Sequence, residues 1–243
     1  MDLRLLDQLL GLVLPLSCAG CGAPDERWCP RCAPALDRAA RRESGCPRLH
    51  RLDGGPPLPV WTAGWYAGPV RSAVLSWKDG GRGELTAVMT AAARTAAAAA
   101  RPQLAAAVAA AGGPLRVVGV PARARAARRR GADLVGRLAD SVTGELVDLG
   151  ARRERVLARR GGASLHALSP AQRSRTDPGY LVSAAVVRGG GYLLVDDVVT
   201  TGATFARCAD ALAGSGALVL GAIAVAATPG FTRSALLPGG EGG

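Results

Sequence analysis

The sequence contains no asparagine, one lysine among its 30 basic residues, and few aromatic residues (4%). The excess of arginine over lysine points to a GC-rich genome and carries little information about function. Two nucleotide-binding loops are also missing. No Gly-Lys-Ser/Thr is present, which excludes a Walker loop, and no G-x-G-x-x-G is present for a dinucleotide fold. The scarcity of aromatic side chains argues mildly against a surface that binds single strands by stacking.

The sequence also lacks an apolar run long enough to cross a bilayer. The Ala-rich stretch 85–111 is interrupted by Arg94 and Arg101, and the Leu-rich stretch 9–16 is interrupted by Pro15. The N-terminus has neither the positive start nor the small-residue cleavage site of a signal peptide. Leu3, Leu6, Leu10 and Val13 fit one helical face, which predicts a short amphipathic helix there. We therefore expect a cytoplasmic protein without a membrane span.

The composition suits one large domain, or one domain and a small module. Of the 243 residues, 49% are hydrophobic, which is enough for a substantial core, and the formal net charge is +11. A positive surface favours phosphate-rich partners, although a well-solvated basic surface explains the charge equally well.

The most informative segment is Tyr192–Thr204. It predicts a buried strand, then the acidic pair Asp196 and Asp197, then a small polar loop and the start of a helix. Such a loop offers backbone N–H groups and the positive end of a helix dipole to a phosphate, while adjacent carboxylates suit the vicinal hydroxyls of a ribose. The segment therefore predicts a ribose 5-phosphate site, against the alternative of a buried strand that merely ends in acidic residues. The residues assigned to the ligand loop are Val198, Val199, Thr200, Thr201, Gly202, Ala203 and Thr204.

Five of the six cysteines lie close together near the N-terminus, and four of them form two Cys-x2-Cys pairs. Two such turns can surround one Zn²⁺ with four thiolates, a closed site whose role is structural. The alternative is a pair of disulfides, which a cytosolic compartment disfavours. The predicted ligands are Cys18, Cys21, Cys29 and Cys32. Cys46 and His50 follow at a spacing for a second metal, but two ligands favour a degenerate site or none.

Strands and helices alternate through the rest of the chain, which predicts an α/β fold with a parallel sheet and helices on both faces. Strands are expected at 61–66, 116–121, 154–157, 180–187, 192–195 and 218–226, and helices at 70–77, 84–100, 102–111, 132–142, 168–175 and 203–213. Residues 1–50 are predicted to form the N-terminal helix and zinc module, 51–60 a linker, 61–228 the main domain, and 229–243 a flexible tail. Ligands of such sheets bind where the parallel strands end, so Pro121 should lie near Asp196.

The strand, acidic pair and Thr-Thr-Gly-Ala-Thr loop resemble the signature of type I phosphoribosyltransferases. Across about residues 1–228 the chain resembles the ComF family of competence proteins, which pair that fold with a zinc ribbon. The resemblance rests on the cysteine module, on 64–71 with Lys78, on 118–131, and on 193–204. The family usually has a second Cys-x2-Cys pair, whereas this chain has only Cys46 there.

The resemblance implies that the chain binds phosphoribosyl pyrophosphate with Mg²⁺. Asp196 and Asp197 would hold the ribose hydroxyls and act in catalysis, and Arg123, with Arg125 or Lys78, would meet the pyrophosphate. Three interpretations remain open. The chain is a transferase acting on an unidentified nitrogen acceptor, a non-catalytic protein that senses phosphoribosyl pyrophosphate or a nucleotide, or a DNA-uptake factor that contacts single-stranded DNA or uptake proteins through its zinc module and basic surface.

Overall fold

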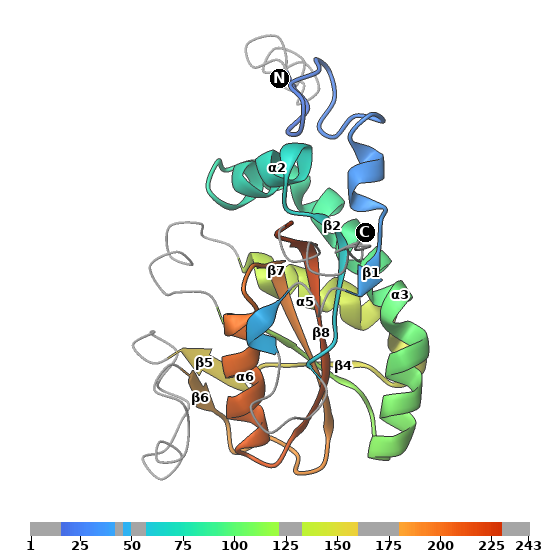
Figure 1. Cartoon of the computed structure of the whole chain (residues 1–243), viewed down its shortest axis with the longest axis vertical. Coiled ribbons are helices and arrows are strands. Elements are labelled where there is room, and N and C mark those ends of the chain that lie inside the picture. Colours follow the sequence, from blue (N-terminus) through green and yellow to red (C-terminus); the bar gives the residue numbers. More distant parts are fainter. Residues whose placement is uncertain (1–15, 42–45, 50–56, 122–132, 160–179, 230–243) are drawn as a thin grey trace, which may run out of the picture.

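The computed structural model describes residues 16–41, 46–49, 57–121, 133–159 and 180–229 of the chain. Their centre is a six-stranded sheet in the order β1-β2-β8-β7-β3-β4, and a separate two-stranded sheet pairs β5 with β6 (Figure 1). All neighbours in the larger sheet are parallel except β1 and β2. The strands are β1 (Ala40–Arg41), β2 (Val60–Trp65), β3 (Arg116–Gly119), β4 (Arg152–Glu154), β5 (Leu157–Arg159), β6 (Tyr180–Val182), β7 (Gly191–Val199) and β8 (Leu218–Ala227).

Helices cover both faces of the larger sheet, as the alternating pattern predicts. Successive side chains of a strand point to opposite faces. Accordingly Leu193 and Val195 of β7 pack in one apolar cluster with α3 and α5, while Tyr192 and Leu194 pack in another with α6. The α-helices are α2 (Gly68–Lys78), α3 (Thr86–Ala111), α5 (Leu134–Glu145) and α6 (Ala203–Ala213), and the short 3-10 helices are η1 (Ala33–Leu36), η3 (Pro47–Leu49), η4 (Gly83–Leu85) and η5 (Val147–Leu149).

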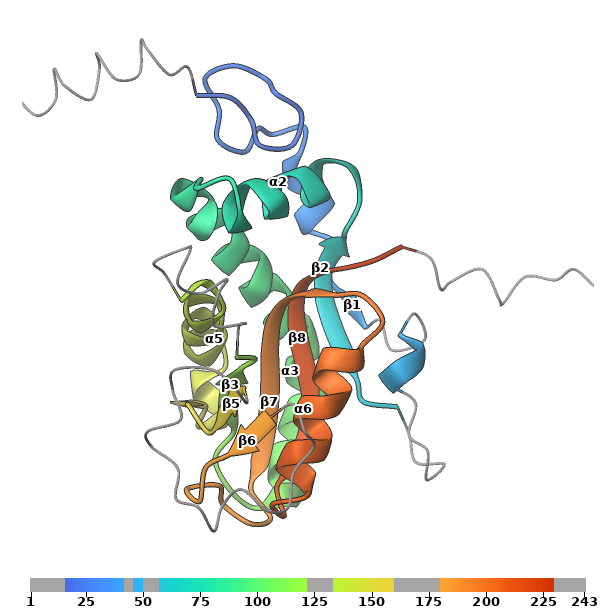
Figure 2. The same ribbon diagram turned by 90° about the vertical axis from the view of Figure 1, so that its left-hand side faces the viewer.

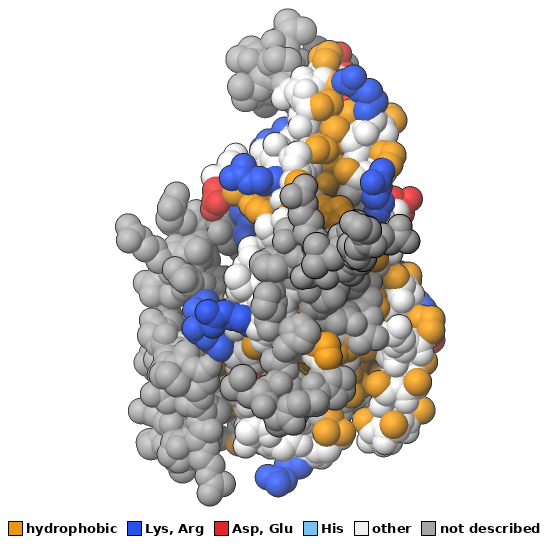
Figure 3. Space-filling model, viewed as in Figure 1, with side chains coloured by type: hydrophobic (Ala, Val, Ile, Leu, Met, Phe, Trp, Pro, Cys, Tyr) orange, Lys and Arg blue, Asp and Glu red, His pale blue; other side chains and the backbone are white. Residues whose placement is uncertain are grey.

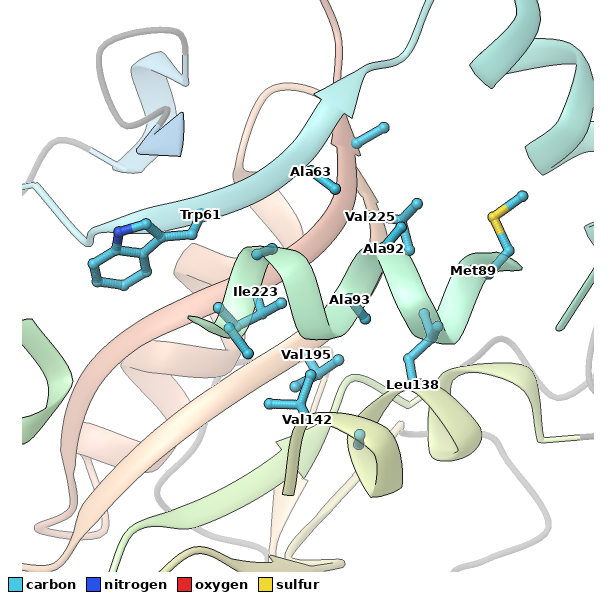
Figure 4. Packing of buried hydrophobic residues seen from close by; sticks show 14 of the residues in the cluster. Trp61, Ala63, Met89, Ala92, Ala93, Leu138, Val142, Val195, Ile223 and Val225 are labelled. Carbon is cyan, nitrogen blue, oxygen red and sulfur yellow. The ribbon is translucent and has the colours of Figure 1, made fainter. Parts of the chain in front are cut away.

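The core between the sheet and α3 is built largely from small side chains. Ala92 and Ala93 of α3 lie against Val225 and Ala63 of the sheet (Figure 4). Because alanine needs little space, the helix approaches the strands closely along its length. Met89 and Leu138 extend this layer toward α5, so one continuous cluster joins α3, α5 and the sheet.

The prediction of two helices at 84–100 and 102–111 is wrong, because α3 is one helix of 26 residues with Pro102 inside it. Proline removes one backbone hydrogen bond and crowds the preceding turn. The alanines around it favour the helix strongly, and their buried face holds it on the sheet. The helix ends at Gly112, whose left-handed conformation (φ 69°) lets its N–H donate to the carbonyls of Val108 and Ala109.

Three of the predicted strands differ most from the structure. The strand predicted at 154–157 is two strands, β4 and β5, which belong to different sheets. The strand predicted at 180–187 ends at Val182. β7 continues beyond Val195 through both acidic residues to Val199, because β8 runs beside it to Ala227 and supplies the pairing.

The N-terminal segment contributes directly to the main sheet and core. β1 adds an antiparallel edge strand to β2, and η3 packs against α6. Gly64 of β2 lies so close to η1 that a Cβ atom there would stand 2.2 Å from the carbonyl oxygen of Ala35. Residues 33–41 and 46–49 therefore pack on the body of the molecule, and the division at residue 50 stays a prediction from sequence.

Candidate functional site

The acidic pair occupies the carboxyl end of β7, where the sheet changes its direction of winding. β3 and β7 are neighbours, with Gly119 paired to Val195. The chain leaves β3 through α5 toward β4, whereas it leaves β7 through α6 on the other face toward β8. Neighbouring strands whose connections diverge in this way leave a crevice at their carboxyl ends, the usual ligand position in such folds. Asp196 and Asp197 follow Val195, the last residue of β7 paired with β3, so they lie at this switch point.

Lys78 reaches the acidic pair from the last turn of α2. Its Nζ lies 2.8 Å from Oδ2 of Asp197. The Asp197 side chain is only 9% exposed and that of Lys78 is 23% exposed, so the pair is largely shielded from water. Figures 1 and 2 both show α2 beyond the carboxyl ends of the strands. The last turn of α2 is linked to the start of α3 by a hydrogen bond from Trp77 Nε1 to Thr86 Oγ1 (3.0 Å). The structure thus brings a predicted ligand residue, Lys78, to the predicted acidic site.

Asp196 has a different environment from its neighbour. Burial, and then the negative charge of Asp197, raise the pKa of the Asp196 carboxyl well above its ordinary value. The N–H of Asp197, which donates to Asp196 Oδ1 (2.9 Å), and the charges of Lys78 and Arg159 act in the opposite direction. One carboxylate is therefore paired with a cation, while burial and a neighbouring negative charge disfavour ionisation of the other.

Arg159 and Tyr180 lie on the same side of β7 as Asp196. The Arg159 guanidinium stands 5.2 Å from the centre of the Tyr180 ring, which is buried. Burial raises the pKa of the Tyr180 phenol, and it therefore stays neutral. Neither residue is recognisable as a site residue from the sequence, because the β5–β6 pairing that brings Arg159 beside Tyr180 has no local sequence signal.

The loop between β7 and α6 is short. It consists of Thr200, Thr201 and Gly202, and Gly202 has the left-handed conformation (φ 79°) that glycine adopts without strain. The N–H of Ala203 donates to Thr201 Oγ1 at 3.4 Å, and the first intrahelical bond is donated by Ala206 to the carbonyl of Gly202. The earlier amides of a helix have no intrahelical partner, so this end offers N–H donors to an anion.

The carboxyl end of β3 lies beside β7 just before the acidic pair. The N–H of Val120 donates to the carbonyl of Val195 (2.8 Å), which holds this end of β3 beside β7, and Pro121 follows, half-buried. The predicted pyrophosphate residue Arg123, and Arg125 with it, lie outside the described residues.

The four predicted zinc ligands come together at the N-terminal end of the described chain. The sulfur atoms of Cys18, Cys21, Cys29 and Cys32 all lie within 4.8 Å of one another. The sulfurs of Cys21 and Cys29 are 3.5 Å apart, well beyond the length of a disulfide, and all four thiols are free. Four thiolates in a tetrahedron around Zn²⁺ would be about 3.8 Å apart, so the donor set and its spacing fit this metal.

The environment of Cys18 favours a thiolate. Burial opposes a charge there, but backbone hydrogen bonds outweigh it and lower the pKa of Cys18 to about 6. One of these bonds is donated by the N–H of Cys29 to the Cys18 sulfur, at 3.3 Å. Hydrogen bonds also lower the pKa of Cys21, whereas burial raises that of Cys32. Both thiols of the first Cys-x2-Cys turn therefore have a lowered pKa, which favours the thiolate form that binds a metal ion.

Cys46, considered above for a second metal, is buried against the loop between β7 and α6. Its thiol lies 3.9 Å from the carbonyl oxygen of Thr200. His50 lies outside the described residues. Among the described residues, the four-cysteine cluster is the one group of at least three His, Cys, Asp or Glu side chains close enough to share a metal.

Comparisons with known proteins add no relative from which a function could be transferred. No protein-family model matches the chain, and no curated protein matches it significantly. Within the described part of the chain, no helix is both long enough and apolar enough to cross a membrane.

Proposed function

We propose that this chain is a ComF-like protein that binds phosphoribosyl pyrophosphate, with Mg²⁺, at the carboxyl ends of β3 and β7. The observation that carries the proposal is the position of Asp196 and Asp197. They stand where the sheet changes direction, with Lys78 opposite and an amide-lined loop immediately after them. A diol, a phosphate and a pyrophosphate each have a chemically matched group at this end of the sheet.

Each part of the ligand has a proposed partner. The carboxylates of Asp196 and Asp197 accept hydrogen bonds from the ribose hydroxyls, and the backbone and hydroxyl groups of Thr200–Thr204 donate to the 5-phosphate. Lys78 supplies a positive charge for the pyrophosphate, with Arg123 assigned to the same group by resemblance. Two carboxylates alone are a sparse magnesium site, but Mg²⁺ commonly binds one or two carboxylates together with substrate phosphates. It would neutralise charge on the leaving pyrophosphate.

The same arrangement suits transfer of the phosphoribosyl group. When the bond from C1 to pyrophosphate breaks, the ribose gains positive charge, and nearby carboxylates stabilise that charge more in the transition state than in the ground state. The nitrogen acceptor then forms the new bond at C1, and the displaced pyrophosphate leaves with the bonding electrons. Release of pyrophosphate during a screen of nitrogen acceptors tests this activity separately from binding.

Calorimetry with phosphoribosyl pyrophosphate and Mg²⁺ tests the binding proposal. We expect binding by the parent chain, and stabilisation by about 2.7 kcal/mol when the free ligand exceeds its dissociation constant a hundredfold. The Asp196→Asn variant should lose this stabilisation. The matched control is Asp210→Asn, which changes an exposed carboxylate of α6 and should bind as the parent does. No heat and no melting shift for the parent at millimolar ligand would refute the proposal.

A second candidate, contact with single-stranded DNA, is favoured by the surface around the cysteine cluster. Arg27, Arg31 and Arg38 are exposed on this part of the chain, and Figure 3 shows basic side chains among apolar ones on the upper part of the molecule. Neutralised phosphates make such binding salt-dependent. Fluorescence anisotropy with a labelled oligonucleotide should then show a dissociation constant that rises steeply with salt concentration. The dissociation constant should be higher still in the double variant Arg27→Ser/Arg31→Ser. Salt-insensitive or undetectable binding would refute this second candidate without affecting the ribose-phosphate proposal.

A further inference from the structure

The loop assigned to the 5-phosphate is held from behind by a segment that lies far away in the sequence. The N–H of Arg48 donates to the carbonyl oxygen of Thr201 (3.3 Å), and the Cys46 thiol lies 3.9 Å from the carbonyl oxygen of Thr200. Arg48 and Cys46 belong to or adjoin the short helix η3, which Figures 1 and 2 both show beside the start of α6. Two consecutive carbonyl groups of the loop are therefore turned toward residues 46–48.

The direction of these carbonyl groups determines the direction of the next amides. No peptide bond in the described chain is cis, and in a planar trans peptide the C=O and the following N–H point in opposite directions. Since the carbonyls of Thr200 and Thr201 face residues 46–48, the N–H groups of Thr201 and Gly202 point away from that segment. No backbone partner within the described residues accepts a hydrogen bond from either of them.

Side-chain packing reinforces this arrangement. Leu49 is 2% exposed and Cys46 is 1% exposed, and both belong to the apolar cluster that includes Val199 and Phe205 on either side of the loop. A Cβ atom at Gly202 would stand 2.6 Å from Cγ of Leu49, so the backbone of the loop lies directly on the leucine side chain. Glycine is favoured at position 202 for two reasons: a larger side chain would clash with Leu49, and the left-handed backbone conformation would be strained in other residues.

We propose that Leu49, together with the backbone of residues 46–48, is a positioning element of the ligand loop. It fixes the peptide planes at 200–202 so that the amides of Thr201 and Gly202 face the phosphate. The inference rests on the proposed function for the identity of the anion, but the loop geometry that it explains is independent of any ligand. The N-terminal segment thereby sets the ligand affinity of a loop that lies about 150 residues further along the chain (154 for Cys46 and Thr200).

The test compares two buried leucines of the same cluster. Leu49→Ala removes the contact with Gly202, whereas Leu212→Ala removes an equally buried side chain near the far end of α6. Both variants lose stability, so melting temperature does not separate them. Leu49→Ala should raise the dissociation constant for phosphoribosyl pyrophosphate with Mg²⁺ about tenfold, equivalent to about 1.4 kcal/mol, and Leu212→Ala less than about twofold. Leu49→Met, which nearly conserves volume, should restore the affinity.

A second measurement uses the protein without ligand. NMR order parameters for the N–H groups of Thr201 and Gly202 should be about 0.85 in the parent and in Leu212→Ala, and below about 0.6 in Leu49→Ala. Unchanged order in Leu49→Ala would overturn the positioning role, whether or not the ligand binds. Failure of the parent to bind the ligand would instead overturn the proposed function, and the order parameters would still decide the role of Leu49.

Discussion

Lys78 and Asp197 form an ion pair of 2.8 Å at the carboxyl end of the sheet, although they belong to α2 and β7. The pair joins the only lysine of the sequence to one of two adjacent acidic residues. Because Asp197 is the more buried partner, loss of the ion pair should cost more free energy when the Asp197 carboxylate is left unpaired than when the Lys78 ammonium group is.

This difference in burial predicts unequal costs for removing either partner. Lys78→Met leaves a buried carboxylate without its cation and should lower the free energy of unfolding by about 2–3 kcal/mol, below the range for a fully buried pair. Asp197→Asn leaves an ammonium group that can reach water and should cost about 1 kcal/mol. Denaturant unfolding measures both. The more exposed Arg82–Glu84 pair provides the control, and Glu84→Gln should cost less than about 1 kcal/mol. Equal costs for Lys78→Met and Asp197→Asn would contradict the asymmetry.

The raised pKa of Asp196 predicts a particular pH dependence of stability. Burial, and then the charge of Asp197, raise the pKa of this carboxyl above its ordinary value of 3.8, so the folded state holds the proton more tightly than the unfolded state does. The resulting stability is fully present below pH 3.8 and is lost as the pH rises through the folded pKa. The parent should therefore lose stability relative to Asp196→Asn as the pH rises. Parallel stability curves for the two proteins would refute this.

The four-cysteine cluster predicts about one zinc ion per chain. Elemental analysis of protein made in zinc-containing medium checks the content, and Cys21→Ser or Cys29→Ser should lose the metal. Cys208→Ala, which changes a buried cysteine in α6 outside the cluster, should retain it. Metal-free folded protein in which all four thiols react freely would exclude the site.

Loss of zinc should affect part of the main core as well as the knuckles. Trp28 packs against both the cysteine cluster and the large apolar cluster, and Ala19 belongs to the latter with Val70 and Val74 of α2. Chelation should therefore lower the melting temperature of the whole molecule and change tryptophan fluorescence. A chelator that leaves the melting temperature unchanged would show that residues 17–32 make no energetic contribution to the body.

A comparison of two glycines with similar backbone conformations distinguishes the cost of backbone strain from the cost of a steric clash. Gly202 and Gly189 have φ of 79° and 73°, but a Cβ atom at Gly202 would meet Leu49 at 2.6 Å while one at Gly189 would meet nothing within 4 Å. Gly189→Ala should cost about 1–2 kcal/mol from the left-handed conformation alone. Gly202→Ala should cost a further 1–3 kcal/mol or so from overpacking. Thermal or denaturant unfolding gives both values, and equal losses would mean that Leu49 yields without cost.

Several features of this protein follow from local sequence patterns. The helix predicted at 203–213 has those bounds in the structure, because the glycine before it and the apolar spacing within it are local signals. The four cysteines meet because each Cys-x2-Cys turn places two sulfurs side by side whatever surrounds it. The alternation of strands and helices likewise predicts the parallel sheet covered on both faces.

Tertiary structure alone decided the neighbours of the candidate site. The family resemblance assigns Lys78 and Asp197 to one ligand, but no local pattern indicates their direct contact. No local pattern near Gly202 indicates that Leu49 lies against it. The continuity of α3 across Pro102 and the extension of β7 to Val199 depend equally on partners elsewhere in the chain. Local patterns determine which backbone conformation a segment prefers. Contacts between distant segments depend instead on sheet order and side-chain packing, which involve the whole chain at once.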